Sequence, residues 1–147
     1  MDRETRFLVV SKLTTNRDAD ATIAAFEEAK AHAHGIKPKT VFTDSLGNYK
    51  NGIRKNFMGV EHVANCGIRG VAHTNNNRIE RLNSTLRERV KVSRGWKTAK
   101  TPMAGGNRIQ YNFVKPHMAL DGKTPASAAG IDIKGWKELL EKAVKRR

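Results

Sequence analysis

Two carboxylates, Asp44 and Glu80, stand where they could hold a divalent cation. Asp44 closes the apolar run of residues 39–44, which predicts a strand, and ligands of open α/β sheets gather at the carboxyl ends of strands. Glu80 lies within the helical pattern of residues 75–94. Mg²⁺ prefers carboxylate and water oxygens and leaves coordination positions for phosphate oxygens. The pair therefore predicts a Mg²⁺ or Mn²⁺ site suited to in-line phosphoryl displacement.

The helix around Glu80 is amphipathic. An apolar stripe with the helical period must face a core, and its members are Ile79, Leu82, Leu86 and Val90. Glu80 lies beside this stripe, and polar or basic residues share its side of the helix: Asn83, Ser84, Arg87 and Lys91. The alternative is a solvated helix in which Glu80 pairs with Ser84 or Arg87, an interaction that contributes only about 0.2–0.5 kcal/mol.

Basic side chains outnumber acidic ones along the same helix. They could form a track for phosphates that continues from Glu80, and they are Arg78, Arg81, Arg87, Arg89, Lys91 and Arg94. An ordinary solvated face is the other interpretation. Because only Glu80 and Glu88 oppose these cations within the helix, contact with DNA is favoured.

The whole chain is strongly basic, with 28 Lys and Arg against 14 Asp and Glu and a formal net charge of +14. The charge is spread along the chain, which indicates a polyanionic partner but does not separate an enzyme from a binding protein. Cys66 is the single cysteine, so an internal disulfide is excluded. No apolar run approaches the ~20 residues that span a membrane, and the N-terminus lacks a signal-peptide pattern. We therefore expect a cytoplasmic protein that does not enter membranes.

The order of predicted elements is typical of an α/β fold. Strands are predicted at residues 7–13, 39–44 and 61–65, and helices at residues 21–34, 45–57 and 75–94. A further helix ends at residues 109–114, Thr124 could cap a short turn, and residues 131–147 are amphipathic. The amphipathic tail could pack on the domain or bind a partner. The pattern predicts a sheet covered by helices.

Three ordered blocks resemble consecutive parts of an insertion-sequence transposase: FTDSLGNYKNGI, NNNRIERLNSTLRERVKVSRG and YNFVKPHMALDGKTPASAAGI. The family is the DDE transposase and retroviral-integrase-like group, whose core is RNase H-like. The resemblance implies that Asp44 is the second catalytic aspartate and Glu80 the catalytic glutamate, both binding Mg²⁺ or Mn²⁺. Asn77 and Arg81 match an asparagine and an arginine of the family. We expect DNA to contact Asn77, Arg81, Arg87 and Lys91.

The family needs one more aspartate, on the first, central strand of its sheet. The resemblance places that strand upstream of Met1 and makes Asp2 a turn residue. It implies an N-terminally shortened, RNase H-like mixed sheet flanked by helices, with the central strand missing. Residues 1–98 would be a partial catalytic core, residues 99–131 its C-terminal helix and loop, and residues 132–147 a basic tail helix. Loss of a strand would leave buried backbone groups unpaired, at about 1–3 kcal/mol each.

The resemblance implies a transposase that cleaves a DNA strand in a metal-dependent reaction and transfers the new 3′-hydroxyl onto target DNA. Such a protein would act at the nucleoid, on transposon ends and target DNA, and could associate with itself or with a full-length transposase. The alternative is a non-catalytic basic fragment, a relic of a mobile element that binds DNA or a transposase. The missing first aspartate leaves open whether this chain is an enzyme.

Overall fold

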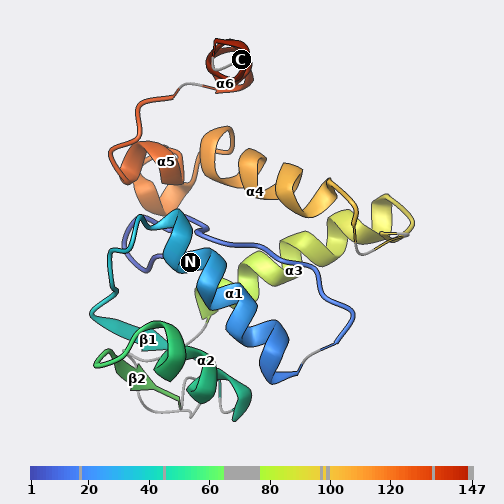
Figure 1. The fold of residues 1–147 in the computed structure, drawn as a ribbon. Helices are drawn as coiled ribbons and strands as arrows, with labels where there is room; N and C mark the ends of the chain where they lie inside the picture. The colour runs from blue at the N-terminus through green and yellow to red at the C-terminus, as the bar shows by residue number, and fades with distance from the viewer. Residues whose placement is uncertain are drawn as a thin grey trace. The chain divides into compact units, whose positions relative to one another are not determined.

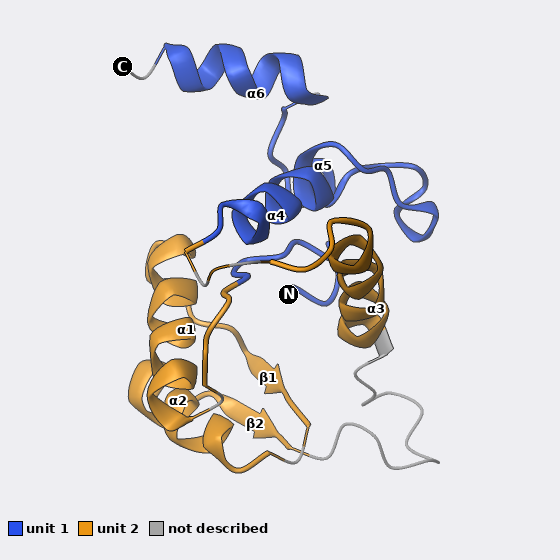
Figure 2. Ribbon diagram, turned by 90° about the vertical axis from the view of Figure 1, so that its right-hand side faces the viewer, with its two compact units in different colours: residues 1–11, 101–147 blue, residues 12–100 orange. Residues whose placement is uncertain are grey.

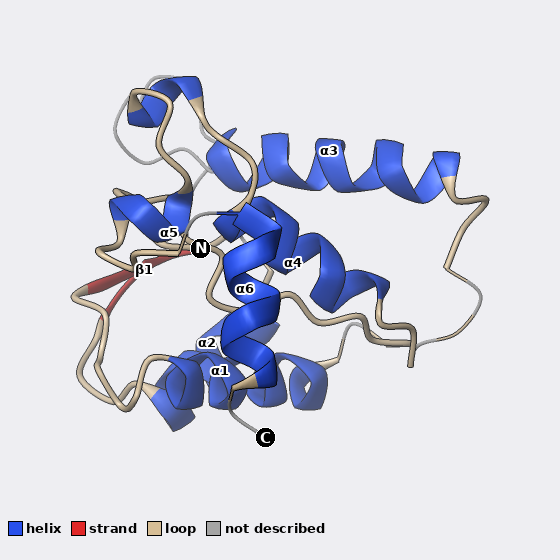
Figure 3. Cartoon of the chain, turned by 90° about the horizontal axis from the view of Figure 1, so that it is seen from above, coloured by secondary structure: helices blue, strands red, loops and turns tan. Residues whose placement is uncertain are grey.

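The computed structural model describes residues 1–16, 18–44, 46–64, 77–96, 98, 100–133 and 135–145. Helices dominate the described chain, and the sheet is small (Figure 3). In chain order the elements are α1 (Ala19–His32), β1 (Thr40–Phe42), α2 (Asn48–Asn56), β2 (Glu61–Val63), α3 (Asn77–Val92), α4 (Met103–Phe113), the 3₁₀ turn η1 (Met118–Leu120), α5 (Pro125–Ala128) and α6 (Gly135–Val144) (Figure 1). The protein is mixed α/β, as the sequence predicts.

The chain divides into two compact units (Figure 2). One unit comprises residues 12–100 and holds both strands with α1, α2 and α3. The other joins residues 1–11 to residues 101–147, so it is built from the two ends of the chain. No helix in the described residues is long and apolar enough to cross a membrane.

Within residues 12–100, β1 and β2 form a two-stranded parallel sheet, and α2 is the connection between them (Figure 2). The register pairs Thr40 with Glu61 and Phe42 with Val63. Thr43 extends the ladder by one bond, because its N–H donates to the Val63 carbonyl at 3.0 Å. The predicted strands at residues 39–44 and 61–65 are thus confirmed, although each is shorter than predicted.

Helices α1 and α2 lie side by side and form the packed core of this unit (Figure 1). The rings of Phe26 and Phe57 meet edge to face, with centroids 5.9 Å apart. Asn56 is buried between the helices, and its Nδ2 donates to the Ile23 carbonyl at 3.3 Å. Asp18 caps the start of α1, because its carboxylate accepts from the backbone N–H of Ala21 at 2.8 Å. Apolar packing and one buried amide therefore hold α1 against α2.

Helix α3 carries the apolar stripe that the sequence predicts. Leu82 is buried, with 4% of its surface exposed. Ile79, Leu86 and Val90 are half-buried, whereas Glu80, Arg81 and Ser84 are exposed. The helix ends as glycine-capped helices do, with Gly95 at φ +86° and its N–H on the Val90 carbonyl at 2.8 Å. The stripe fixes which side of α3 is left for solvent or a ligand.

The predicted strand at residues 7–13 is wrong, because these residues form no ladder with another strand. Leu8 is instead held by a side chain: its N–H donates to Asn112 Oδ1 at 2.8 Å, and its C=O accepts from Asn112 Nδ2 at 3.0 Å. The Val9 carbonyl accepts from Arg108 Nη1 at 2.9 Å. Side chains of α4 therefore bond to both backbone groups of Leu8 and to the Val9 carbonyl, in place of a neighbouring strand.

The rest of the unit formed by residues 1–11 and 101–147 follows the sequence pattern closely. The predicted helix that ends at residues 109–114 is α4, and Phe113 packs edge to face on Phe7 with centroids 6.1 Å apart. Thr124 caps α5, because its hydroxyl accepts from the Ser127 N–H at 3.2 Å. Pro125 is fully buried at the start of α5. The amphipathic tail forms α6, in which no described residue is buried.

Candidate metal and nucleic-acid site

Asp44 lies just beyond the carboxyl end of β1, and its side chain is exposed. Its Oδ1 accepts from the backbone N–H of Leu46 at 3.1 Å, which forms a short turn and fixes one side of the carboxylate. In the described part of the chain, the ladder bond of Thr43 to Val63 stands directly before Asp44. The local fold therefore presents an acidic side chain at the sheet edge where α/β proteins bind ligands.

The carbonyl of Asp44 is held by Thr43, which in turn contacts His62 of β2, and neither residue was among the predicted site residues. The Thr43 hydroxyl lies 2.9 Å from the Asp44 carbonyl oxygen and 2.8 Å from Nε2 of His62. Thr43 is buried, with 7% of its surface exposed. Side chains on a strand alternate between the two faces, so the observed register places His62 on the same face as Val41 and Thr43. The sequence pattern gives the alternation but does not fix this register.

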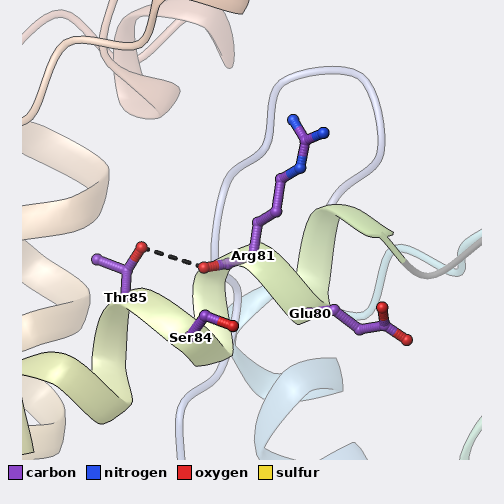
Figure 4. A pocket seen from close by; sticks show the side chains of 4 residues that line it. All are labelled: Glu80, Arg81, Ser84 and Thr85. Atoms are coloured by element: carbon purple, nitrogen blue, oxygen red, sulfur yellow. Dashed lines mark hydrogen bonds between the residues drawn. The ribbon is translucent and has the colours of Figure 1, made fainter.

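Glu80 is fully on the solvent side of α3, beside an open depression of about 440 Å³ (Figure 4). The described residues that line this depression are Glu80, Arg81, Ser84 and Thr85. The Thr85 hydroxyl donates to the Arg81 carbonyl at 3.1 Å, and the Glu80 and Arg81 side chains point in different directions. Among the described residues Glu80 makes no ion pair, so the pairing with Arg87 that the alternative interpretation requires is not found.

The basic residues expected to contact DNA differ in their surroundings. Arg81 and Arg87 are exposed on α3. Lys91 is exposed as well, but its Nζ lies 2.9 Å from Oε1 of Glu88. Such an exposed pair one turn apart contributes only about 0.2–0.5 kcal/mol, so a phosphate can compete for Lys91. The side chain of Asn77 lies outside the described residues.

Both candidate ligands belong to the unit of residues 12–100. Asp44 is not among the described residues that line the depression beside Glu80. Within the described parts of the chain, no group of three or more His, Cys, Asp or Glu side chains is placed to hold a metal ion. Cys66 and His73 lie outside the described residues. The arrangement thus offers two separate exposed carboxylates and a basic helix face.

Asp2 acts as the turn residue that the sequence predicts. Its Oδ2 accepts from the Thr5 N–H at 2.7 Å and from the Thr5 hydroxyl at 2.6 Å. Burial opposes the charge of this carboxylate, but the hydrogen bonds from Thr5 and its neighbours outweigh burial and lower the Asp2 pKa. The Asp2 N–H also donates to the Phe7 carbonyl at 2.8 Å, which closes the turn. The oxygens of Asp2 are therefore engaged in local structure.

Comparison with known proteins tests the resemblance in the sequence. A family model for the DDE domain of transposases matches residues 1–110. No curated protein and no solved structure matched the chain. The matched region contains Asp44 and the whole of α3, and it covers well over half of the chain. The chain therefore belongs to the DDE transposase family of insertion sequences.

Proposed function

We propose that this chain is the catalytic-core portion of an insertion-sequence transposase and that Asp44 and Glu80 hold its divalent cations. The observation that carries the proposal is the position of Asp44, an exposed carboxylate directly after a parallel strand. Glu80 supports it, because this carboxylate is exposed on a helix of the same compact unit and forms no ion pair among the described residues. The reaction is metal-dependent cleavage of a DNA strand followed by strand transfer.

The donor set fits Mg²⁺ or Mn²⁺. Both residues offer carboxylate oxygens, which hard divalent cations prefer, and the exposure of both leaves room for water and phosphate oxygens. Asp44 Oδ2 takes no part in the turn with Leu46, which uses Oδ1. When bound, the cations supply positive charge that stabilises the attacking and leaving oxygens of phosphoryl transfer. The role of the two side chains is to fix where that charge sits.

The exposed face of α3 is the proposed DNA contact. Glu80, Arg87 and Lys91 follow one line along this face. With a rise of about 1.5 Å per residue, Arg87 lies about 10 Å and Lys91 about 16 Å along the helix axis from Glu80. Arg81 and Asn77 would contact DNA near the carboxylate. In this arrangement one helix carries both a metal ligand and the cations that position the phosphate backbone.

The connection from β1 through α2 to β2 supports an RNase H-like sheet, of which this parallel pair would be one part. We assign residues 1–98 to the catalytic core, residues 99–131 to its C-terminal helix and loop, and residues 132–147 to a basic tail. DNA is the proposed partner, and association with a second copy or with a full-length transposase remains a prediction.

Thermal unfolding with and without Mn²⁺ tests this function. A ligand that binds only the folded state raises its stability, by about 2.7 kcal/mol at a concentration 100 times Kd. We expect Mn²⁺ to raise the melting temperature of the wild type and of the control Asp121→Asn, which removes an exposed carboxylate from the other unit. Asp44→Asn should abolish the shift. A cooperative transition without any response to Mn²⁺ would instead favour the non-catalytic DNA-binding fragment.

A further inference from the structure

The Thr43 hydroxyl makes two contacts, and only one of them can use its hydrogen. The hydroxyl oxygen lies 2.9 Å from the Asp44 carbonyl oxygen, which can only accept. It also lies 2.8 Å from Nε2 of His62. Because the single hydroxyl hydrogen goes to the carbonyl, Nε2 of His62 must carry a hydrogen and donate it to Thr43. The direction of the chain is then from His62 through Thr43 to Asp44.

This chain of hydrogen bonds ties the Asp44 peptide to the neighbouring strand. Among the described residues, the ladder bond nearest to Asp44 joins the Thr43 N–H to the Val63 carbonyl, and the bond from the Thr43 hydroxyl adds a hold on Asp44 itself. The turn to Leu46 fixes the carboxylate oxygen Oδ1, and the Thr43 hydroxyl fixes the carbonyl of the same residue. Thr43 is buried, so water competes poorly for its hydroxyl. Asp44 is held from both sides although its side chain is exposed.

We propose that His62 and Thr43 are positioning residues that orient Asp44 for the divalent cation, a role that rests on the proposed function. Hydrogen-bond partners around metal ligands set ligand orientation, and their loss typically weakens metal binding by about 10–100-fold. His62 comes from β2 and Asp44 follows β1. The pairing register of the two strands therefore determines whether the hydrogen bonds from His62 through Thr43 to Asp44, here called the relay, can form. The pairing of the two strands thereby determines how the Asp44 carboxylate is oriented.

The test compares variants that remove the relay with variants that keep it. Thr43→Val keeps the side-chain shape but loses the hydroxyl, and His62→Phe keeps a ring but loses the donor. Thr43→Ser retains the hydroxyl, and His62→Gln retains an N–H donor. We expect Thr43→Val and His62→Phe to weaken Mn²⁺ binding about tenfold, measured by calorimetry, whereas Thr43→Ser and His62→Gln bind nearly as the wild type does. The double variant Thr43→Val/His62→Phe should lose no more than either single variant, because the two residues act as one unit.

Nitrogen NMR of the imidazole ring provides a second readout that does not depend on metal. The ring signals of His62 should show a hydrogen on Nε2 in the wild type, and this preference should be lost in Thr43→Val. Lower melting temperatures with unchanged Mn²⁺ affinity in Thr43→Val and His62→Phe would overturn the positioning role while leaving the proposed function intact. If the folded wild type shows no Mn²⁺ binding that depends on Asp44, the proposed function fails and the role of the relay fails with it, even if NMR finds the hydrogen bond.

Discussion

The side-chain amide of Asn112 binds both backbone polar groups of Leu8. Its Oδ1 accepts from the Leu8 N–H at 2.8 Å, and its Nδ2 donates to the Leu8 carbonyl at 3.0 Å. Only 2% of Asn112 and 4% of Leu8 are exposed, so water cannot replace these bonds. A residue near the start of the chain is thereby fixed to α4 by the same pair of bonds that a neighbouring strand would make.

Asn112→Leu should destabilise the protein strongly. The substitution keeps the branching at Cγ but leaves the Leu8 N–H and C=O buried without partners, at about 1–3 kcal/mol each, and the larger leucine side chain adds to the cost. Urea denaturation followed by circular dichroism measures the change in the free energy of unfolding. Asn83→Leu is the matched control, because Asn83 is exposed on α3 and its loss should change stability by no more than about 0.5 kcal/mol. Equal effects at the two positions would contradict the role assigned to Asn112.

Gly52→Ala should destabilise the packing of α1 on α2. A Cβ at position 52 would lie 2.8 Å from Cδ2 of Phe26 and 3.0 Å from Cγ2 of Thr22. Phe26 cannot easily move, because its ring packs against Phe57. We expect a loss of about 1–3 kcal/mol from overpacking, larger than the gain of about 1 kcal/mol that alanine brings to a helix. Thermal or urea unfolding measures the sign of the change.

Gly106→Ala is the control for that experiment. Gly106 lies inside α4 and is exposed, and a Cβ added there would meet no atom within 4 Å outside its own helix turn and chain neighbours. Alanine there should stabilise the protein by up to about 1 kcal/mol through helix propensity alone. A stabilising effect of both substitutions would show that α1 and α2 have room between them.

The sequence predicted the elements that local patterns define. The apolar stripe of α3 and the Thr124 cap each depend on neighbouring residues, and both are confirmed. The strand at residues 7–13 was predicted from β-forming residues, but a strand requires a partner with unpaired backbone groups. The amide of Asn112 satisfies Leu8 from a position 104 residues away, and no local pattern indicates such a bond.

In the candidate site, too, local patterns predicted some residues, whereas contacts between distant segments could not be predicted. Asp44 was identified from its place after an apolar strand, and Glu80 from its place among basic residues on a helix. Thr43 and His62 were not among the predicted site residues, because their contacts depend on the register between β1 and β2, which single-strand patterns do not fix. The exposure of Glu80 follows from the position of Leu82, which is buried on the other side of α3. Residue identity predicted the candidate ligands, whereas pairing between segments determined which side chains surround Asp44.

Acidification should destabilise the unit that contains His117. Burial lowers the pKa of His117 below its ordinary value of 6.5, and the positive charges of Lys115 and Arg6 lower it further. A hydrogen bond with the Tyr111 backbone opposes this shift but does not reverse it. The unfolded chain binds a proton on His117 more tightly than the folded chain does. The contribution of neutral His117 to the free energy of unfolding is therefore complete above pH 6.5 and falls as the pH drops from there through the pKa of the folded state.

Urea midpoints measured across this pH range check the prediction. His117→Gln should flatten the dependence on pH, whereas His34→Asn, which removes an exposed histidine and suits the left-handed backbone at position 34, should leave it unchanged. Asp2 affects stability at a more acidic pH, because its pKa is lowered in the folded protein. Its contribution to the free energy of unfolding is present above pH 3.8 and is lost as the pH falls below that value. A flat profile for the wild type between neutral pH and the range of Asp2 would contradict the assignment to His117.

Charge reversal on α3 should weaken DNA binding and reduce its dependence on salt. Arg87→Glu with Lys91→Glu removes two proposed phosphate contacts, so the slope of log affinity against log salt should fall in magnitude by about 2. Fluorescence anisotropy with duplex DNA at several salt concentrations measures the slope. Lys30→Glu with Lys50→Glu makes the same change of charge at exposed positions of α1 and α2. If both double variants lower the slope equally, net charge and not the α3 face governs binding.

Glu88→Gln tests the same prediction in the opposite direction. Glu88 holds the Lys91 ammonium at 2.9 Å, and removal of its charge frees Lys91 for phosphate. We expect slightly tighter DNA binding and a steeper salt dependence in this variant. Combined with Lys91→Glu, the substitution should have no such effect, because the cation that it releases is gone. Tighter binding in the combined variant would assign the effect to lost negative charge in general.

Asp44→Asn and Glu80→Gln should each abolish Mn²⁺-dependent DNA cleavage if the two carboxylates hold the metal. Asparagine can still accept from the Leu46 N–H through its Oδ1, so the turn is retained while the charge is lost. The effect on cleavage is therefore separable from an effect on folding, which the melting temperature without metal reports. Full cleavage by either variant would remove that residue from the metal site. A wild type that binds Mn²⁺ through Asp44 yet cleaves no DNA would place this chain among binding fragments of transposases, because two carboxylates would then suffice for affinity but not for the reaction.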